Sequence, residues 1–163
     1  MVTKKLSEET WRTCVNSIPI FGIDMIIFSP KLGVLMGSRL NNPAKGKLFV
    51  PGGRVYKNER MIDAFNRILL SETGLIFPFN KSSSMGLYEH FYNVTSWSTS
   101  QCSTHYIIEA RLIEIDPENI KLKINLNEQH SDFKWISLEN INSSTIHSYS
   151  NMYLNKIKDL KSI

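Results

Sequence analysis

Glu72 and the glycine pair Gly52 and Gly53 are the residues whose types and positions first indicate chemistry. Glu72 ends an apolar pattern of helical period, and at ~100° per residue it lies about 40° from Ile68 and about 60° from Leu69. Its carboxylate therefore points with the apolar face, where it needs a cation or hydrogen-bond donors; a salt bridge to an arginine is the alternative. At the two glycines the backbone must turn sharply or approach a ligand. Glu72 is thus a candidate ligand for a hard cation, which prefers oxygen.

Asp24 is a second acid in apolar surroundings. It stands in the β-rich segment Ile23–Ser29, where burial without a partner is costly, unless the position is a turn or a sheet edge. The turn Pro30–Lys31 and the β-rich segment Gly33–Arg39 follow, so a hairpin is predicted.

The elements that must position these acids can be inferred from periodicity and caps. Ser7, followed by acids, predicts a helix to about Ser17, and a second helix should run from Glu59 to Thr73 and stop at Gly74. The other expected elements are strands at Lys47–Val50, Met85–Asn93, His105–Ile115, Lys121–Ile124 and Phe133–Ile136, a helical turn at Ser137–Asn140, and a closing helix at Ile146–Leu160. This order favours an α+β fold with a mixed sheet between helices.

Length and composition narrow the function classes. The chain has 163 residues, of which 42% are apolar and 21% charged, so one globular domain over residues 1–163 is expected. The apolar stretch Ile18–Phe28 is too short and too interrupted to span a membrane, and the first residues lack a secretory signal pattern. The expectation is a cytoplasmic enzyme or binding module, with Cys14 and Cys102 as buried thiols.

The net charge of +4 comes from scattered basic residues rather than a basic stripe. This distribution argues against nucleic acid as a partner and weakly favours an anionic small molecule.

The segment from Gly53 to Leu75 resembles the Nudix box. That motif places a glycine, a glutamate, an arginine, an aliphatic residue, a glutamate, a glycine and an aliphatic residue at fixed spacing, and the chain matches it with Gly53, Glu59, Arg67, Leu69, Glu72, Gly74 and Leu75. Two positions depart from the motif, because Ile68 and Ser71 stand where glutamates are expected. With only Glu72 left, one divalent ion per active site is the expected number.

Loss of these two acids, together with further matching blocks, resembles one branch of the superfamily, the GDP-mannose mannosyl hydrolases. The blocks include Asn42-Pro43-Ala44, Phe49–Val55, His90-Phe91-Tyr92, Thr104-His105-Tyr106 and Glu128-Gln129-His130, and they extend roughly from Ser17 to Trp135. The resemblance implies a Nudix fold and a single Mg²⁺, for which Mn²⁺ can substitute. It also implies a homodimer and a role in bacterial surface polysaccharide synthesis.

The resemblance also implies roles for individual residues. The metal ligands would be the Gly52 carbonyl, the Glu72 carboxylate and the Gln129 amide. His130 would be the general base, and Arg54 would neutralise charge on the departing GDP. A nucleoside diphosphate is already a weak base, so one base suffices, unlike the two carboxylates of common inverting glycosidases.

Further positions match residues that contact the sugar or the diphosphate: Asp24, Arg39, His90 and Tyr106. Arg67 is another substrate-binding candidate, although it could instead pair with Glu59. Surface salt bridges are the alternative for Arg39, and core packing is the alternative for Tyr106. Trp11 falls where the family has an aromatic residue that stacks on guanine, and core packing is equally compatible with its position.

The resulting hypothesis is hydrolysis of GDP-mannose, and of GDP-glucose, to GDP and free sugar, by water attack at the sugar C1 with inversion. A pyrophosphohydrolase that attacks phosphorus, and a non-catalytic nucleotide-sugar binder, are the alternatives. Ile68 and Ser71 argue against phosphorus attack.

Overall fold

The computed structural model describes residues 6–40, 45–93, 103–116, 130–141 and 143–161. The elements in these ranges are α1 (Glu8–Ser17), β1 (Ile20–Ser29), β2 (Gly33–Arg39), β3 (Leu48–Phe49), β4 (Gly52–Arg54), α2 (Met61–Thr73), η1 (Phe79–Lys81), β5 (Ser83–Tyr92), β6 (Thr104–Glu114), β7 (His130–Ile136), η3 (Leu138–Asn140) and α3 (Ser148–Lys161). Among these helices, none has the length and apolar character needed to cross a membrane.

Strand β1 is the centre of a mixed sheet. It runs parallel to β6 from Ile20 to Phe28, and on its other edge it pairs antiparallel first with β4 at Gly22–Asp24 and then with β2 at Phe28–Ser29. β7 and β3 pair with β2, and β5 pairs with β6. Asp24 therefore lies on a central strand at the point where β1 changes partner, and the turn or edge position considered for it is wrong.

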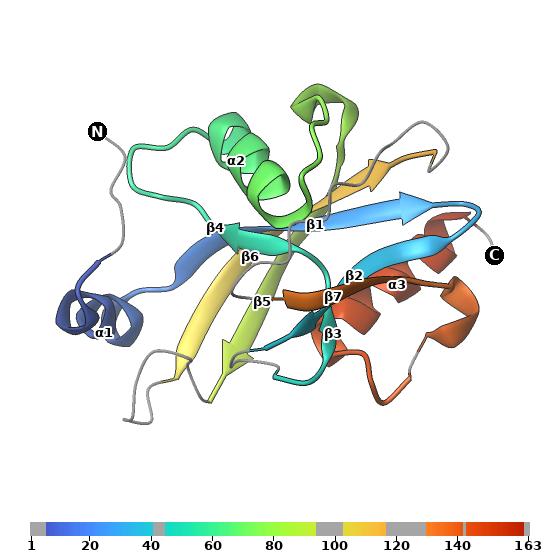
Figure 1. The fold of residues 1–163 in the computed structure, drawn as a ribbon. Helices are drawn as coiled ribbons and strands as arrows, with labels where there is room; N and C mark the ends of the chain where they lie inside the picture. Colours follow the sequence, from blue (N-terminus) through green and yellow to red (C-terminus); the bar gives the residue numbers. More distant parts are fainter. Residues whose placement is uncertain (1–5, 41–44, 94–102, 117–129, 142, 162–163) are drawn as a thin grey trace.

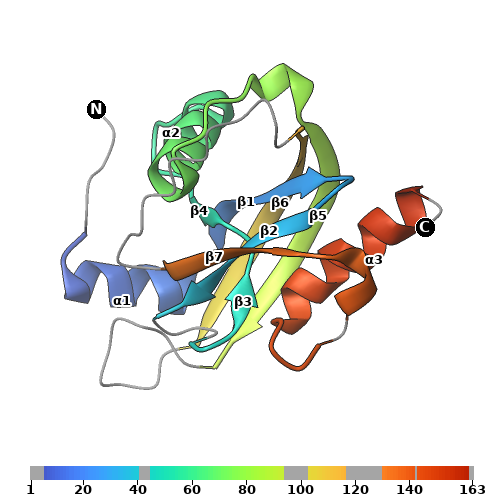
Figure 2. The ribbon, with the colours of Figure 1, turned by 45° about the vertical axis from the view of Figure 1, so that its right-hand side comes forward.

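Helices α2 and α3 cover opposite faces of this sheet (Figures 1 and 2). Below α2, Phe65, Ile68 and Leu69 pack with Ile23 and Met25 of β1 in one buried cluster. On the other face, Tyr153, Leu154 and Ile157 of α3 pack with a second cluster that includes Ile26 and Phe28. The expected α+β fold with a mixed sheet between helices is confirmed.

Both predicted helix ends are confirmed. Ser7 caps α1, since its Oγ accepts a hydrogen bond from the Thr10 backbone N–H at 3.3 Å. Gly74 ends α2 with φ at 72°, a left-handed conformation that favours glycine. The predicted hairpin of β1 and β2 is also present.

Several boundaries differ from the sequence-based expectations. Gly52 and Gly53 are strand residues of β4 rather than a sharp turn. The closing helix begins at Ser148, because Ile146 instead forms a bridge with Leu48 of β3. The expected strand Lys121–Ile124 lies outside the described residues. Cys14 is a free thiol, half-buried rather than buried, and Cys102 is also outside the described part.

Candidate active site

A bidentate ion pair organises the loop that leads into α2. Arg67 donates from Nε to Glu59 Oε1 at 2.6 Å and from Nη2 to Oε2 at 2.8 Å. Its Nη2 also donates to the carbonyl of Arg54 at 2.9 Å, and Glu59 Oε2 accepts from the Tyr56 N–H. The bond from Arg67 lowers the pKa of Glu59 and raises that of Arg67. The alternative considered for Arg67, a salt bridge with Glu59, is confirmed. The same guanidinium also holds the Arg54 backbone through its carbonyl.

Glu72 points inward, as the helical periodicity predicted. Its residue exposure is 7%, and Ile68 and Leu69 on the same face of α2 are 1% and 0% exposed. A Cβ placed on Gly53 would lie 3.2 Å from Ile68 Cγ1, so this face of α2 packs directly on β4. Ser71 is exposed and donates to the Ile68 carbonyl.

Asp24 is buried with an internal hydrogen-bond partner. Its Oδ2 accepts from the Tyr153 hydroxyl at 2.8 Å, and its Oδ1 occupies the space that a Cβ on Gly52 would need. Gly52 is therefore required to be a glycine by the carboxyl group opposite it in the sheet. Burial raises the pKa of Asp24 to about 7, although the Tyr153 bond and the nearby Arg39 charge oppose the shift.

His90 lies on the other side of the Tyr153 hydroxyl. Its Nε2 is 3.1 Å from Tyr153 Oη, and its ring stacks on Tyr149 with a centroid distance of 3.9 Å. The side chain is 2% exposed, and burial, helped by the charge of His147, lowers its pKa to about 4. The imidazole is therefore neutral near pH 7.

Arg39 and Tyr106 belong to the same region. Burial raises the pKa of Asp24 and Tyr106 and lowers that of His147; the positive charge of Arg39 opposes the two rises and adds to the lowering. The Arg39 Cζ lies 5.7 Å from the Phe49 ring centroid. Its Nε is buried, and among the described residues it has no hydrogen-bond partner. Tyr106 is half-buried on β6 and stands directly opposite His90 in the antiparallel register. A cationic donor beside polar aromatic rings suits an anionic ligand with hydroxyl groups.

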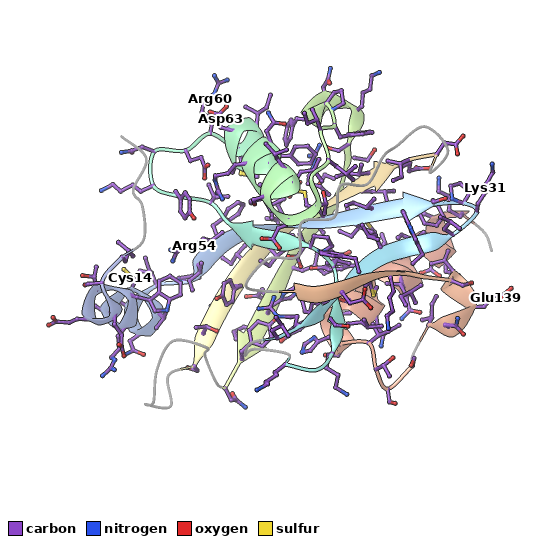
Figure 3. All side chains as sticks on the ribbon, in the orientation of Figure 1. Cys14, Lys31, Arg54, Arg60, Asp63 and Glu139 are labelled. Atoms are coloured by element: carbon purple, nitrogen blue, oxygen red, sulfur yellow. The ribbon has the colours of Figure 1, made fainter. Side chains whose placement is uncertain are left out.

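Arg54 and Trp11 are brought together beside the start of β1, where Arg54 is the register partner of Gly22. The Arg54 Cζ lies 4.5 Å from the Trp11 ring centroid and 5.4 Å from that of Tyr56. Figure 3 shows Arg54 between β4 and α1. One Trp11 ring face is thus occupied by a cation–π contact.

The two remaining site candidates are described in part or not at all. Gln129 lies outside the described residues. His130 begins β7, where its backbone is the register partner of Arg39, and its side chain lies outside the described part. Among the described side chains, no group of three or more His, Cys, Asp or Glu residues could hold a metal ion. The described donors for an oxygen-ligand site are the Gly52 carbonyl and the Glu72 carboxylate.

Sequence reasoning missed Tyr153 as a polar partner. Tyr149 and Tyr153 fall within the predicted closing helix Ile146–Leu160, whose apolar periodicity assigns them no polar role, yet both hydroxyls form hydrogen bonds. Their spacing of one helical turn in an otherwise aliphatic stripe was the available signal.

Comparisons with known proteins bear on the family and the fold. Residues 19–154 match the family model described as NUDIX domain. The "Low-salt glycan biosynthesis protein Agl8" of Haloferax volcanii is 36% identical over 132 residues, which cover 81% of this chain and 80% of that protein.

Solved structures show the same fold at lower identity. The MutT protein from Methanosarcina mazei Go1 aligns with a TM-score of 0.65 and 19% identity, over 90% of this chain and 99% of that one. The NUDIX domain of Shewanella oneidensis NrtR, cocrystallised with ADP ribose, aligns with a TM-score of 0.68 and 14% identity, over 96% and 99% of the two chains.

Proposed function

The chain belongs to the NUDIX domain family, and from that premise we propose that it hydrolyses GDP-mannose, and GDP-glucose, to GDP and free sugar by attack of water at the sugar C1. One observation carries the choice of C1 over phosphorus. Ile68, at a position where the family motif has a glutamate, is 1% exposed and packs against Gly53, while Ser71 replaces a second glutamate at an exposed position. The carboxylates that would gather several cations around a diphosphate are thus missing.

The same observation supports a single divalent ion. Glu59 is engaged by Arg67, and Glu72 is the box glutamate on the face of α2 that packs on β4, so we assign the ion to Glu72. The oxygen donors of Gly52, Glu72 and Gln129 fit Mg²⁺ or Mn²⁺, because hard cations take carboxylate, amide and backbone oxygens. The 7% exposure of Glu72, on the helix face that packs against β4, agrees with this assignment. When bound, such an ion supplies neutralising charge to the diphosphate.

The chemistry at C1 then needs one proton acceptor and a stabilised leaving group. We assign His130 as the base that removes the proton of the attacking water, which enters opposite the departing GDP and inverts C1. The GDP leaves as a weak base without protonation. Arg67 holds the carbonyl of Arg54, and the positive charge of the Arg54 side chain would stabilise the departing diphosphate.

Substrate contacts are assigned to the residues around these groups. Asp24, His90 and Tyr106 would bind sugar hydroxyls, and Arg39, with a buried Nε, would bind the diphosphate. Arg67 would act through Arg54 and Glu59 rather than by its own contact. Trp11 would place guanine, and its cation–π contact with Arg54 would connect the base and diphosphate subsites.

The relative from Haloferax volcanii supports a sugar-nucleotide substrate, since its name places it in glycan biosynthesis. A homodimer is part of the same proposal, and sedimentation at working concentration tests it.

Product analysis tests the proposed reaction. Incubation with GDP-mannose and Mg²⁺ should yield GDP and mannose on chromatography. Formation of GMP and mannose 1-phosphate would instead show that the protein is a pyrophosphohydrolase. Binding of GDP-mannose without turnover would show that it is a non-catalytic nucleotide-sugar binder.

A further inference from the structure

The Tyr153 hydroxyl joins two side chains from different strands. Tyr153 comes from α3, Asp24 from β1 and His90 from β5, and the two distances from the hydroxyl are 2.8 Å to Asp24 Oδ2 and 3.1 Å to His90 Nε2. The three residues are 0%, 5% and 2% exposed. Water therefore competes little for these bonds, and the protein alone sets their geometry.

Packing requirements do not explain this hydroxyl. The Tyr153 ring meets the Tyr88 ring edge-on, with centroids 4.9 Å apart, and belongs to a buried hydrophobic cluster. A phenylalanine would fill the same volume and bury no polar atom, which makes it the cheaper residue for packing alone. The hydroxyl is thus accounted for by its two polar partners.

The neighbouring helical turn holds His90 as well. Tyr149 stacks on the His90 ring at an interplanar angle of 11°. Its hydroxyl accepts from the Phe91 N–H at 2.7 Å and donates to the Phe91 carbonyl at 3.1 Å. Residues 149 and 153 are one helical turn apart, so α3 contacts His90 twice. Tyr149 stacks on the face of the ring, and the Tyr153 hydroxyl contacts Nε2 at its edge.

A proton count fixes the state of His90. When Asp24 is ionised, above its pKa of about 7, the single hydrogen of the Tyr153 hydroxyl is donated to Asp24 Oδ2. Toward His90 the hydroxyl must then accept, so Nε2 carries the imidazole hydrogen and Nδ1 is the ring's acceptor. The carboxylate and Nδ1 are both acceptors, which suits a ligand that presents hydroxyl donors.

We propose that Tyr153 is a positioning residue for the sugar end of the substrate, because its hydroxyl sets the orientation of Asp24 and the tautomer of His90 together. This inference rests on the proposed function for the identity of the ligand, a hydroxyl-rich sugar joined to a diphosphate. The arrangement of the three residues does not depend on that identity.

The kinetic test uses Tyr153→Phe in the full chain, with Tyr88→Phe as the matched control in the same interface. We expect kcat/KM for GDP-mannose to fall about 10- to 100-fold in Tyr153→Phe, the scale of a misplaced contact, while Tyr88→Phe stays near wild type. Inhibition by GDP, which lacks the sugar, should change less than about twofold. Equal losses for GDP-mannose and GDP, or no loss for either, would overturn the proposal.

A second measurement separates this inference from the proposed function. At a pH above 7, where Asp24 is ionised, the ¹⁵N resonances of the His90 ring in wild-type protein should show a neutral imidazole protonated at Nε2, and Tyr153→Phe should change them. Protonation at Nδ1, or spectra unaltered by the substitution, would refute the positioning role without any assay. Wild-type protein inactive on GDP-sugars but with these spectra would instead refute only the proposed substrate.

Discussion

Asp24 and His90 flank the same tyrosine hydroxyl, and the protein shifts their pKa values in opposite directions. Burial raises the pKa of Asp24 to about 7 and lowers that of His90 to about 4. The two side chains thus keep a low total charge in a region that excludes water.

The opposite shifts predict opposite dependences of stability on pH. Between the ordinary pKa of Asp24, 3.8, and its folded value of about 7, the folded state binds the extra proton, so its contribution to stability falls as pH rises. For His90, between about 4 and the ordinary 6.5, the unfolded state binds the extra proton, so its contribution rises with pH. In the wild type the two largely cancel.

Asp24→Asn should therefore become more stable relative to wild type as pH rises from about 4 to about 7, by at most ~1.4 kcal/mol per pH unit. His90→Gln should show the reverse slope. Urea unfolding in the presence of a chelator measures both, and the slope rather than the offset is the test. Parallel profiles for the wild type and both variants would contradict the assignment.

Ile68→Glu is expected to damage the fold without creating phosphorus attack. The position is 1% exposed and lies against Gly53, so a carboxylate there would be a buried charge costing about 3–5 kcal/mol. Ser71→Glu is the matched control, because Ser71 is exposed and its change should stay within about 0.5 kcal/mol. Pyrophosphohydrolase activity in the double variant would show that the box alone sets the reaction.

Glu72→Gln should lower metal affinity at least about tenfold while the fold remains, because it removes the charge of the proposed ligand but keeps its shape. Titration with Mn²⁺ in the presence of GDP measures the site, with one tight ion per chain expected in the wild type. Two or more tightly bound ions per chain would contradict this prediction, because they would show that the missing box acids do not limit the number of bound ions.

His130→Gln should reduce kcat by roughly 10²- to 10⁴-fold and abolish the acidic limb of the pH–rate profile, since the base is removed. Gln129→Ala is the control, and it should weaken metal binding yet retain that limb. Near-full activity of His130→Gln with the limb intact would move the base elsewhere, with His90 and His105 as the next candidates.

Local patterns predicted those parts of the structure that depend on local spacing. Helical periodicity predicted that Glu72 faces the sheet, and its burial confirms this. The pairing of Arg67 with Glu59 was one of the two alternatives for Arg67, and the structure contains this ion pair. The Tyr153–Asp24 bond was not predictable in this way. It joins residues 129 positions apart, and it exists only once α3 packs on β1.

The glycine pair shows the same limit. Its small residues indicated a close approach, but the partner, Asp24 Oδ1, is set by the antiparallel pairing of β1 with β4. Pairing between distant short strands leaves no periodic signal in the sequence.

Hydrolysis of GDP-mannose in ¹⁸O-enriched water tests the central claim most directly. If water attacks the sugar C1, the GDP product has unshifted mass and the label enters the sugar. Label in the phosphate of the products would contradict the account, because it would show that water attacks phosphorus.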